Sequence, residues 1–331
     1  MESQAAAAPG RPRVRAGDIW LDALTEREVV SAVRDAWLAG RGGSIITVNV
    51  DVARTVARRP ELADLMAAGS LVVADGMPLV WAARLGGNPL PERVTGSSLV
   101  FSLSAAAAAD RRSVYLLGGA DGVPDQAAAA LCARFPGLRI AGADSPPLGF
   151  DQTEEGVRRA VTAVGAAAPD LVLVGLGFPK QERLIGRLRQ VRPGAWYLGC
   201  GGGIPMAAGV TPRAAPLVQR AGLEWAHRLA LEPRRLAGRY LRDDLPFAIA
   251  LLARAALRRA HPAASLTRQA QIPCPRACSA RSTWSPRTRP SATATANGTR
   301  RSCQFLPSAR AAQRQASARR PRHAWANAIC P

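Results

Sequence analysis

The chain alternates short, continuous apolar runs with longer segments in which apolar residues recur three or four positions apart. A short apolar run bounded by turn residues is typical of a buried strand, and the longer period is typical of a helix packed on one face. We therefore predict six strands, at residues 44–48, 71–74, 113–117, 138–141, 170–174 and 195–198. Helices are predicted between them, at residues 25–39, 50–59, 61–68, 78–85, 97–109, 123–135, 153–167 and 179–190.

This alternation indicates the fold class. Strands separated by helices of about 10–15 residues indicate crossover connections, which place neighbouring strands parallel. We predict an α/β domain over residues 17–215, with a mainly parallel sheet and helices on both faces. Residues 1–16 are predicted to be flexible, and residues 18–24 to form a short extended opening. The helix at 25–39 begins with a capping-box pattern made by Thr25 and Glu28.

Polar residues stand where the first two strands end. In an open parallel sheet, ligands bind beyond the carboxyl ends of the strands. Thr47 and Asn49 close the strand at 44–48 and project to the same side, and Asp75 follows the strand at 71–74. Asn49 could equally cap the next helix. Asp75 could be either a general base or a turn and helix cap.

A glycine-rich segment, residues 175–182, leaves the strand at 170–174 and opens the next helix. Glycine lets a ligand approach the backbone closely, and free N–H groups at a helix start favour phosphate. Gly175, Gly177 and Lys180 are the candidate phosphate-binding residues, and Gln181 can also reach a ligand from the first turn. The glycine spacing does not match the dinucleotide-binding fingerprint, which argues against a nicotinamide enzyme. Tight turns explain the glycines at residues 118–119 and 199–203 equally well.

Residues 216–260 are predicted to form a basic, amphipathic helical appendage. Its apolar face is formed by Val218, Ala221, Trp225 and Leu229. A ladder of Arg220, Glu224 and Arg228 runs beside that face, and Pro233 ends the helix. Residues 220–260 hold nine Arg against four acidic residues. The segment could be an interfacial element that lies on anionic lipid and binds a diphosphate. It could equally be an ordinary solvated helical face.

Charge divides the chain into two parts. The net charge of the 331 residues is +20, but residues 261–331 hold twelve Arg and no acidic residue, which leaves +8 for residues 1–260. Residues 261–331 lack helical or strand periodicity and are predicted to be a disordered, Arg-rich tail. Two explanations of this tail stay open: a frame-shifted extension of the gene, and an RNA- or membrane-binding arm.

The sequence carries no signal for crossing a membrane. No apolar run reaches the roughly 18 residues that span a bilayer, and the N-terminus lacks the apolar stretch of a signal peptide. Four of the six Cys lie in residues 261–331, so a disulfide framework is not expected and a reducing cytosol fits best. Cys274 and Cys278 have no second close pair of ligands, which argues against a zinc site. No metal and no cofactor are expected.

Several longer motifs stand in a characteristic order. They are residues 47–49 (TVN), 74–78 (ADGMP), 93–96 (RVTG), 175–182 (GLGFPKQE), 213–216 (RAAP), 222–229 (GLEWAHRL) and 232–235 (EPRR). Together they resemble the WecG/TagA/CpsF family of bacterial glycosyltransferases over about residues 16–245. The stretch from residue 222 to residue 235 is the most specific part of the resemblance, since each glycine turn alone is common.

The resemblance implies a Rossmann-like transferase of the GT-E type that inverts the anomeric centre without a metal. Its substrates would be a UDP-sugar, with N-acetylmannosamine or a related hexose, and a polyprenyl-diphosphate-linked acceptor for cell-surface polysaccharide or teichoic acid. On this pattern Asp75 deprotonates the acceptor hydroxyl. The substrate-binding residues would be Thr47, Asn49, Arg93 and Gln181, with Arg228, Arg235 and Arg239 clamping the diphosphate.

The same resemblance implies a cytoplasmic protein that lies on the anionic inner face of the cell membrane, without a nucleic-acid partner, and it leaves a homo-oligomer open. Two other functions are compatible with the sequence: a nucleotide-binding oxidoreductase on a similar sheet, and a nucleic-acid binder that uses the basic tail. Binding of NAD without binding of UDP would favour the first. Loss of function on deletion of residues 261–331 would favour the second.

Overall fold

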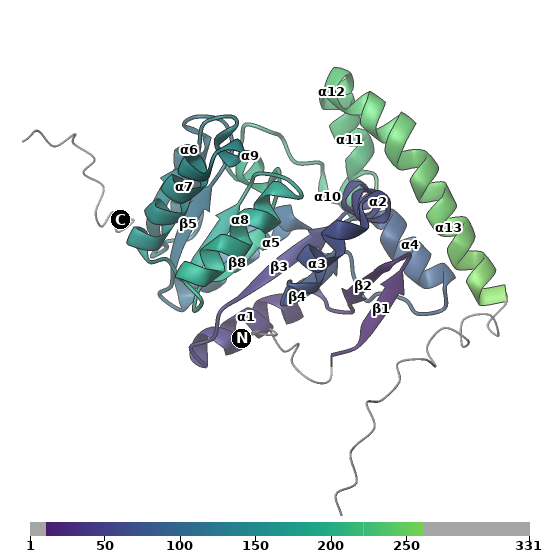
Figure 1. Ribbon diagram of the computed structural model, residues 1–331, viewed down its shortest axis with the longest axis horizontal. Helices are drawn as coiled ribbons and strands as arrows, with labels where there is room; N and C mark the ends of the chain where they lie inside the picture. Colours follow the sequence, from purple (N-terminus) through teal and green to yellow (C-terminus); the bar gives the residue numbers. More distant parts are fainter. Residues whose placement is uncertain (1–10, 221, 261–331) are drawn as a thin grey trace, which may run out of the picture. The chain divides into compact units, whose positions relative to one another are not determined.

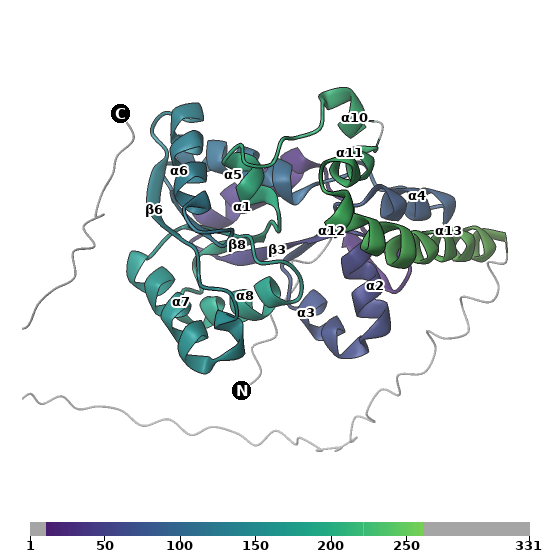
Figure 2. The same ribbon diagram turned by 90° about the horizontal axis from the view of Figure 1, so that it is seen from above.

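The computed structural model describes residues 11–220 and 222–260, and Figures 1 and 2 show it from two directions. The predicted Arg-rich tail, residues 261–331, lies outside the described residues, as do the first ten residues of the predicted flexible start.

Six strands form one parallel sheet in the order β4, β3, β8, β7, β5, β6. Their bounds are β3 (Gly43–Val48), β4 (Leu71–Ala74), β5 (Ser113–Leu117), β6 (Arg139–Asp144), β7 (Leu171–Val174) and β8 (Trp196–Gly199). The register pairs Val48 with Ala74 and Ile46 with Gly199, so the carboxyl ends of β4, β3 and β8 meet at one edge. The predicted α/β class with a parallel sheet is confirmed, and every predicted strand overlaps an observed one.

Helices cover both faces of the sheet (Figure 1). One face carries α1 (Glu26–Leu38), α5 (Gly96–Ala109), α6 (Val123–Arg134) and α9 (Gly203–Ala207). The other carries α2 (Val50–Arg58), η1 (Pro60–Leu62), α3 (Ala63–Ala67), α4 (Met77–Leu85), η2 (Phe150–Gln152), α7 (Glu154–Ala167) and α8 (Lys180–Val191). Successive strand residues point to opposite faces, so Ile45 packs in the first core and Ile46 in the second. The helix α9 was not predicted, because its sequence begins inside the glycine run at residues 199–203.

A hairpin precedes the sheet. Strands β1 (Arg13–Ala16) and β2 (Ile19–Asp22) pair antiparallel around Gly17, whose φ is +65°. The Asp22 carboxylate accepts the backbone N–H of Val72 over 2.7 Å, which joins the hairpin to the edge strand β4. The prediction that flexibility extends to residue 16 is therefore wrong for residues 13–16, because their alternating apolar side chains are buried in the second core.

The C-terminal described residues are helical. They form α10 (Pro216–Arg220), α11 (Glu224–Leu231), α12 (Pro233–Ala237), the π-helical segment η3 (Gly238–Asp244) and α13 (Leu245–Ala260). None of the described helices is long and apolar enough to cross a bilayer. The single helix predicted from residue 218 to Pro233 is wrong, because Gly222 lies between α10 and α11 with φ of +73°. A Cβ at Gly222 would lie 2.4 Å from Met77 Cγ, so the chain turns where only glycine fits.

Candidate active site

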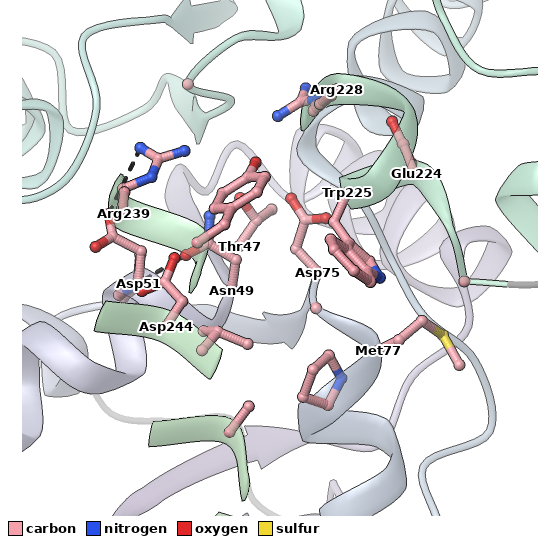
Figure 3. Close-up of a pocket in the computed structure, with 18 of the residues that line it drawn as sticks. Thr47, Asn49, Asp51, Asp75, Met77, Glu224, Trp225, Arg228, Arg239 and Asp244 are labelled. Carbon is pink, nitrogen blue, oxygen red and sulfur yellow. Dashed lines mark hydrogen bonds and ion pairs between the residues drawn. The ribbon is translucent and has the colours of Figure 1, made fainter. Parts of the chain in front are cut away.

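A cavity of about 620 Å³ opens at the carboxyl ends of β3, β4 and β8 (Figure 3). Its other walls come from α4, α11, η3 and α13. Eight of the eleven predicted site residues line it: Thr47, Asn49, Asp75, Arg93, Gly177, Gln181, Arg228 and Arg239. The folding of a parallel sheet thus brings together strand ends that are far apart in the sequence.

Asp75 stands directly after β4 and faces this cavity. Its backbone N–H continues the strand ladder to the carbonyl of Val48 over 2.8 Å. Its Oδ2 accepts the backbone N–H of Gly96 over 3.2 Å, at the N-terminus of α5. Burial raises the pKa of the Asp75 carboxyl, and nearby Glu224 adds to that rise. The Gly96 N–H and the cations Arg228 and Arg93 oppose it, so this carboxylate is a stronger base than an exposed aspartate.

Gly96 allows α5 to approach the strand ends. A Cβ at this position would lie 3.1 Å from Cys200 Cα and 3.1 Å from Thr47 Oγ1. The preceding Thr95 caps the helix by accepting the N–H of Ser98 over 3.0 Å. The Gly96 N–H that donates to Asp75 is therefore fixed in position by close packing and by the helix cap.

Thr47 and Asn49 both make bonds within the protein. The buried Thr47 hydroxyl donates to the carbonyl of Gly199 over 3.0 Å and so joins β3 to β8. Asn49 is the N-cap of α2, since its Oδ1 accepts the N–H of Val52 over 3.0 Å. The capping alternative for Asn49 is confirmed, while its exposed side chain also lines the cavity.

Gln181 ties the two glycine-rich strand exits together. Its Oε1 accepts the N–H groups of Gly177, over 3.1 Å, and Gly201, over 3.3 Å. Its Nε2 donates to Glu182 Oε1 over 2.8 Å. Both side chains are buried, and burial raises the pKa of Glu182 to about 7. The two loops therefore keep a fixed separation, which sequence spacing alone did not predict.

The structure does not bring Lys180 into the cavity wall. Its Nζ pairs with Asp151 Oδ1 at 3.1 Å, and 46% of its side chain is exposed. Gly175 lines a second cavity of about 230 Å³, together with Gly201 and Gly202. Of the three predicted phosphate-binding residues, the two glycines border one or the other of these two cavities and Lys180 borders neither.

Arg93 forms a buried ion pair that sequence reasoning missed. Its Nη1 and Nη2 each lie 3.2 Å from Glu224 Oε2, and both side chains line the cavity. Glu224 was predicted to stand in a ladder with Arg220 and Arg228 beside the apolar face. The alternative of a solvated face is wrong for Glu224, which is buried beyond the turn at Gly222. The available signal was that Glu224 lies within the most specific of the sequence motifs.

Arg228 and Arg239 line both cavities. Arg228 Nη2 lies 3.5 Å from Met206 Sδ, and Arg239 Nη1 lies 4.0 Å from Asp51 Oδ2. The Nε atom of each is buried and has no hydrogen-bond partner among the described residues. Two guanidinium groups at a wall shared by both cavities form a site suited to an anion. The side chain of Arg235, in α12, lies outside the described part of the structure.

A model of the Glycosyl transferase WecG/TagA/CpsF family matches residues 14–261. The chain belongs to this family. Two curated relatives carry the name N-acetylglucosaminyldiphosphoundecaprenol N-acetyl-beta-D-mannosaminyltransferase. The chain is 30% identical over 195 residues to that of Bacillus spizizenii strain W23 (59% of this chain, 74% of the relative). It is 29% identical over 194 residues to that of Bacillus subtilis strain 168 (59% and 73%). The predicted family and the assignment as a glycosyltransferase are confirmed.

In this glycosyltransferase a second polar cluster anchors the C-terminal helices beside the cavity. Arg54, on α2, lies 2.5 Å from Asp51, 2.9 Å from Asp244 and 3.7 Å from Asp243. Figure 3 shows Asp51, Arg239 and Asp244 together at one side of the cavity, with Glu224 and Arg228 across it on α11. Burial, then the charge of Asp51, raises the pKa of Asp244 to about 6. No sequence motif pointed to this cluster, whose partners are 190 residues apart.

Within residues 11–220 and 222–260, no three His, Cys, Asp or Glu side chains are grouped as a metal site requires. The expectation that the reaction needs no metal stays a prediction.

Proposed function

We propose that the protein transfers N-acetylmannosamine, or a related hexose, from a UDP-sugar to a sugar linked to polyprenyl diphosphate. The observation that carries this proposal is the Asp75 carboxylate, held by an α5 N–H and facing a cavity whose wall carries Arg228 and Arg239. The names of the two relatives supply the acceptor class and the sugar. The family match favours transfer over the oxidoreductase alternative.

In the proposed reaction, Asp75 takes the proton of the acceptor hydroxyl. The acceptor oxygen forms a bond to the anomeric carbon from the side opposite to UDP, and the bond from that carbon to the UDP oxygen breaks. The configuration of the sugar is therefore inverted, the electron pair leaves with UDP, and the proton resides on Asp75. The raised pKa of Asp75 suits this role, because a stronger base removes the hydroxyl proton more readily.

The leaving diphosphate gains negative charge as the bond breaks, and we assign its stabilisation to Arg228 and Arg239. Both residues line the two cavities, so their guanidinium groups carry positive charge at the wall that the cavities share. Charge-assisted bonds from such groups are strong in a partly buried site. Arg235 remains a further candidate for the same charge. The backbone N–H groups of Gly175 and Gly177 already donate to the Leu117 carbonyl and to Gln181 Oε1, so these glycines would contribute close backbone approach and no free donor.

The location of the reaction follows from the proposed acceptor, whose lipid stays in a membrane. We propose peripheral association with the inner face of the cell membrane, supported by the excess of Arg over acidic residues in residues 220–260. A homo-oligomer stays a prediction.

The test is release of UDP from a panel of UDP-sugars in the presence of a polyprenyl-diphosphate-linked N-acetylglucosamine. We expect turnover with UDP-N-acetylmannosamine, unchanged by a chelator. Asp75→Asn should lower kcat by about 10²–10⁴-fold with an unchanged circular dichroism spectrum. Asp121→Asn, at an exposed turn, is the matched control and should retain full activity. Full activity of Asp75→Asn would exclude Asp75 as the base.

A further inference from the structure

The cavity has two ends of opposite character. Asp75, Arg93 and Arg228 line its polar end. The other end lies between α4 and α13, which pack side by side (Figures 1 and 2). It is lined by Trp81, Leu241, Leu245, Ala248, Ile249 and Leu252. We call this end the apolar arm.

The apolar arm is open to solvent despite its composition. Trp81 is 41% exposed, Leu245 48% and Ile249 59%. Leu245, Ile249 and Leu252 stand at positions i, i+4 and i+7 of α13, so they form one stripe that faces the cavity. Exposed apolar residues gathered in a continuous patch mark a binding surface, because leaving them in water is unfavourable.

Side chains other than Leu245 and Ile249 attach α13 to the domain. Leu251 is buried in the second core, and Phe247 packs against the same cluster. The ion pairs of Arg54 with Asp243 and Asp244 fix the start of the helix. Leu252 also packs against this cluster, so within the stripe only Leu245 and Ile249 are left with a role other than holding the helix in place.

A ligand that fills both ends must itself be amphiphilic. The polar end offers guanidinium groups for phosphate, and the arm offers only apolar contacts. A UDP-sugar has no apolar segment to match the arm. An isoprenoid diphosphate has both parts in one molecule, with the phosphates directly joined to the chain.

We propose that the apolar arm binds the isoprenoid chain of the acceptor next to its diphosphate, with Trp81 and Ile249 as the main contacts. This inference rests on the proposed function for the identity of the acceptor. Its consequence is a site that selects the lipid part of the acceptor as well as its sugar. Trp81 offers a flat, rigid surface from α4, and Ile249 offers an exposed aliphatic side chain from α13.

The experiment measures equilibrium binding by calorimetry, so it does not depend on turnover. The probes are farnesyl diphosphate and methyl diphosphate, which share the phosphates and differ in the chain. The protein should bind farnesyl diphosphate at least tenfold more tightly. Trp81→Ser and Ile249→Ser should each weaken farnesyl diphosphate binding by about tenfold and leave methyl diphosphate binding unchanged.

Leu257→Ser is the matched control. Leu257 is 62% exposed on the same helix and does not line the cavity, so this variant should bind both probes as the unaltered protein does. Equal binding of the two probes by the unaltered protein would overturn the proposal. So would equal weakening by Leu257→Ser, which would indicate general surface adsorption.

Loss of vesicle binding or of self-association in Ile249→Ser, with the preference for farnesyl diphosphate intact, would assign the stripe to a membrane or a second copy instead. Failure of sugar transfer alongside the expected preference would count against the proposed function alone.

Discussion

The backbone N–H of Gly96 donates to Oδ2 of Asp75 over 3.2 Å, although the two residues are 21 positions apart. This bond links the residue after β4 to the first turn of α5. The positive end of a helix favours a carboxylate, so α5 both orients Asp75 and limits the rise of its pKa. The position of the proposed base therefore depends on how closely α5 approaches the sheet.

Substitution of Gly96 tests this dependence. In Gly96→Ala the new Cβ would lie 3.1 Å from both Cys200 Cα and Thr47 Oγ1, so the start of α5 must shift. We expect a loss of about 1–3 kcal/mol in the free energy of unfolding and at least a tenfold fall in kcat. Urea unfolding and initial-rate kinetics measure the two effects. Gly186→Ala is the control, because Gly186 is exposed in α8 with no atom within 4 Å of a new Cβ, and it should gain stability.

Glu224 provides a test of the pKa of Asp75. Its negative charge raises that pKa, and its ion pair with Arg93 reduces the opposing effect of that cation. Glu224→Gln should therefore lower the pKa of Asp75. The base must be deprotonated to act, so the acid limb of the profile of kcat/KM against pH should move to lower pH.

The matched control for this profile is Glu155→Gln, which removes the same charge from an exposed position on α7 and should leave the acid limb in place. Movement of the limb to higher pH in Glu224→Gln would contradict the assignment of Asp75 as the titrating base.

Local sequence signals predicted most of the sheet and part of the site. The capping box of Thr25 and Glu28 is formed, and β4 and β5 have the predicted bounds, because these features depend on neighbouring residues. Asp75 and Asn49 were found because parallel strands place their carboxyl ends together.

Contacts between distant segments could not be predicted in this way. The pairing of Arg93 with Glu224 joins residues 131 positions apart, and it exists only because the chain turns at Gly222. That turn requires glycine because of Met77, which is a neighbour in space and not in sequence. The period of apolar residues across Gly222 indicated one helix, since periodicity carries no information about the space beside a glycine.

Gln181 tests whether the glycine loops must be held together. Gln181→Met keeps the side-chain volume and removes the acceptor of the N–H groups of Gly177 and Gly201. These N–H groups are partly buried, and leaving both of them unpaired should cost about 1–3 kcal/mol. We expect weaker UDP binding by calorimetry, because the loops border both cavities. Lys180→Ala is the control and should bind UDP normally, since Lys180 pairs with Asp151 outside the cavity wall. Weaker binding by Lys180→Ala instead would restore Lys180 as a phosphate ligand.

Asp244 should make the stability of the protein depend on pH in an unusual direction. Burial and the charge of Asp51 raise its pKa to about 6, with Arg54 and Arg239 opposing the rise. In the unfolded chain an aspartate titrates near pH 3.9, so between about pH 4 and pH 6 only the folded state holds the proton. Folding then binds a proton, and the contribution of Asp244 to the free energy of unfolding falls as the pH rises through this window and is constant above it.

The variant Asp244→Asn cannot titrate and isolates this contribution. Urea unfolding of both proteins at pH 4.5, 5.5, 6.5 and 7.5 gives the difference in their free energies of unfolding. The free energy of unfolding of the unaltered protein, minus that of the variant, should be most positive at the lowest pH. This difference should decrease up to about pH 6 and should then level off. A difference that grows with pH would mean that Arg54 lowers the pKa of Asp244 below its ordinary value. The ion pair with Arg54 would then outweigh burial, and the C-terminal helices would be held most firmly at neutral pH.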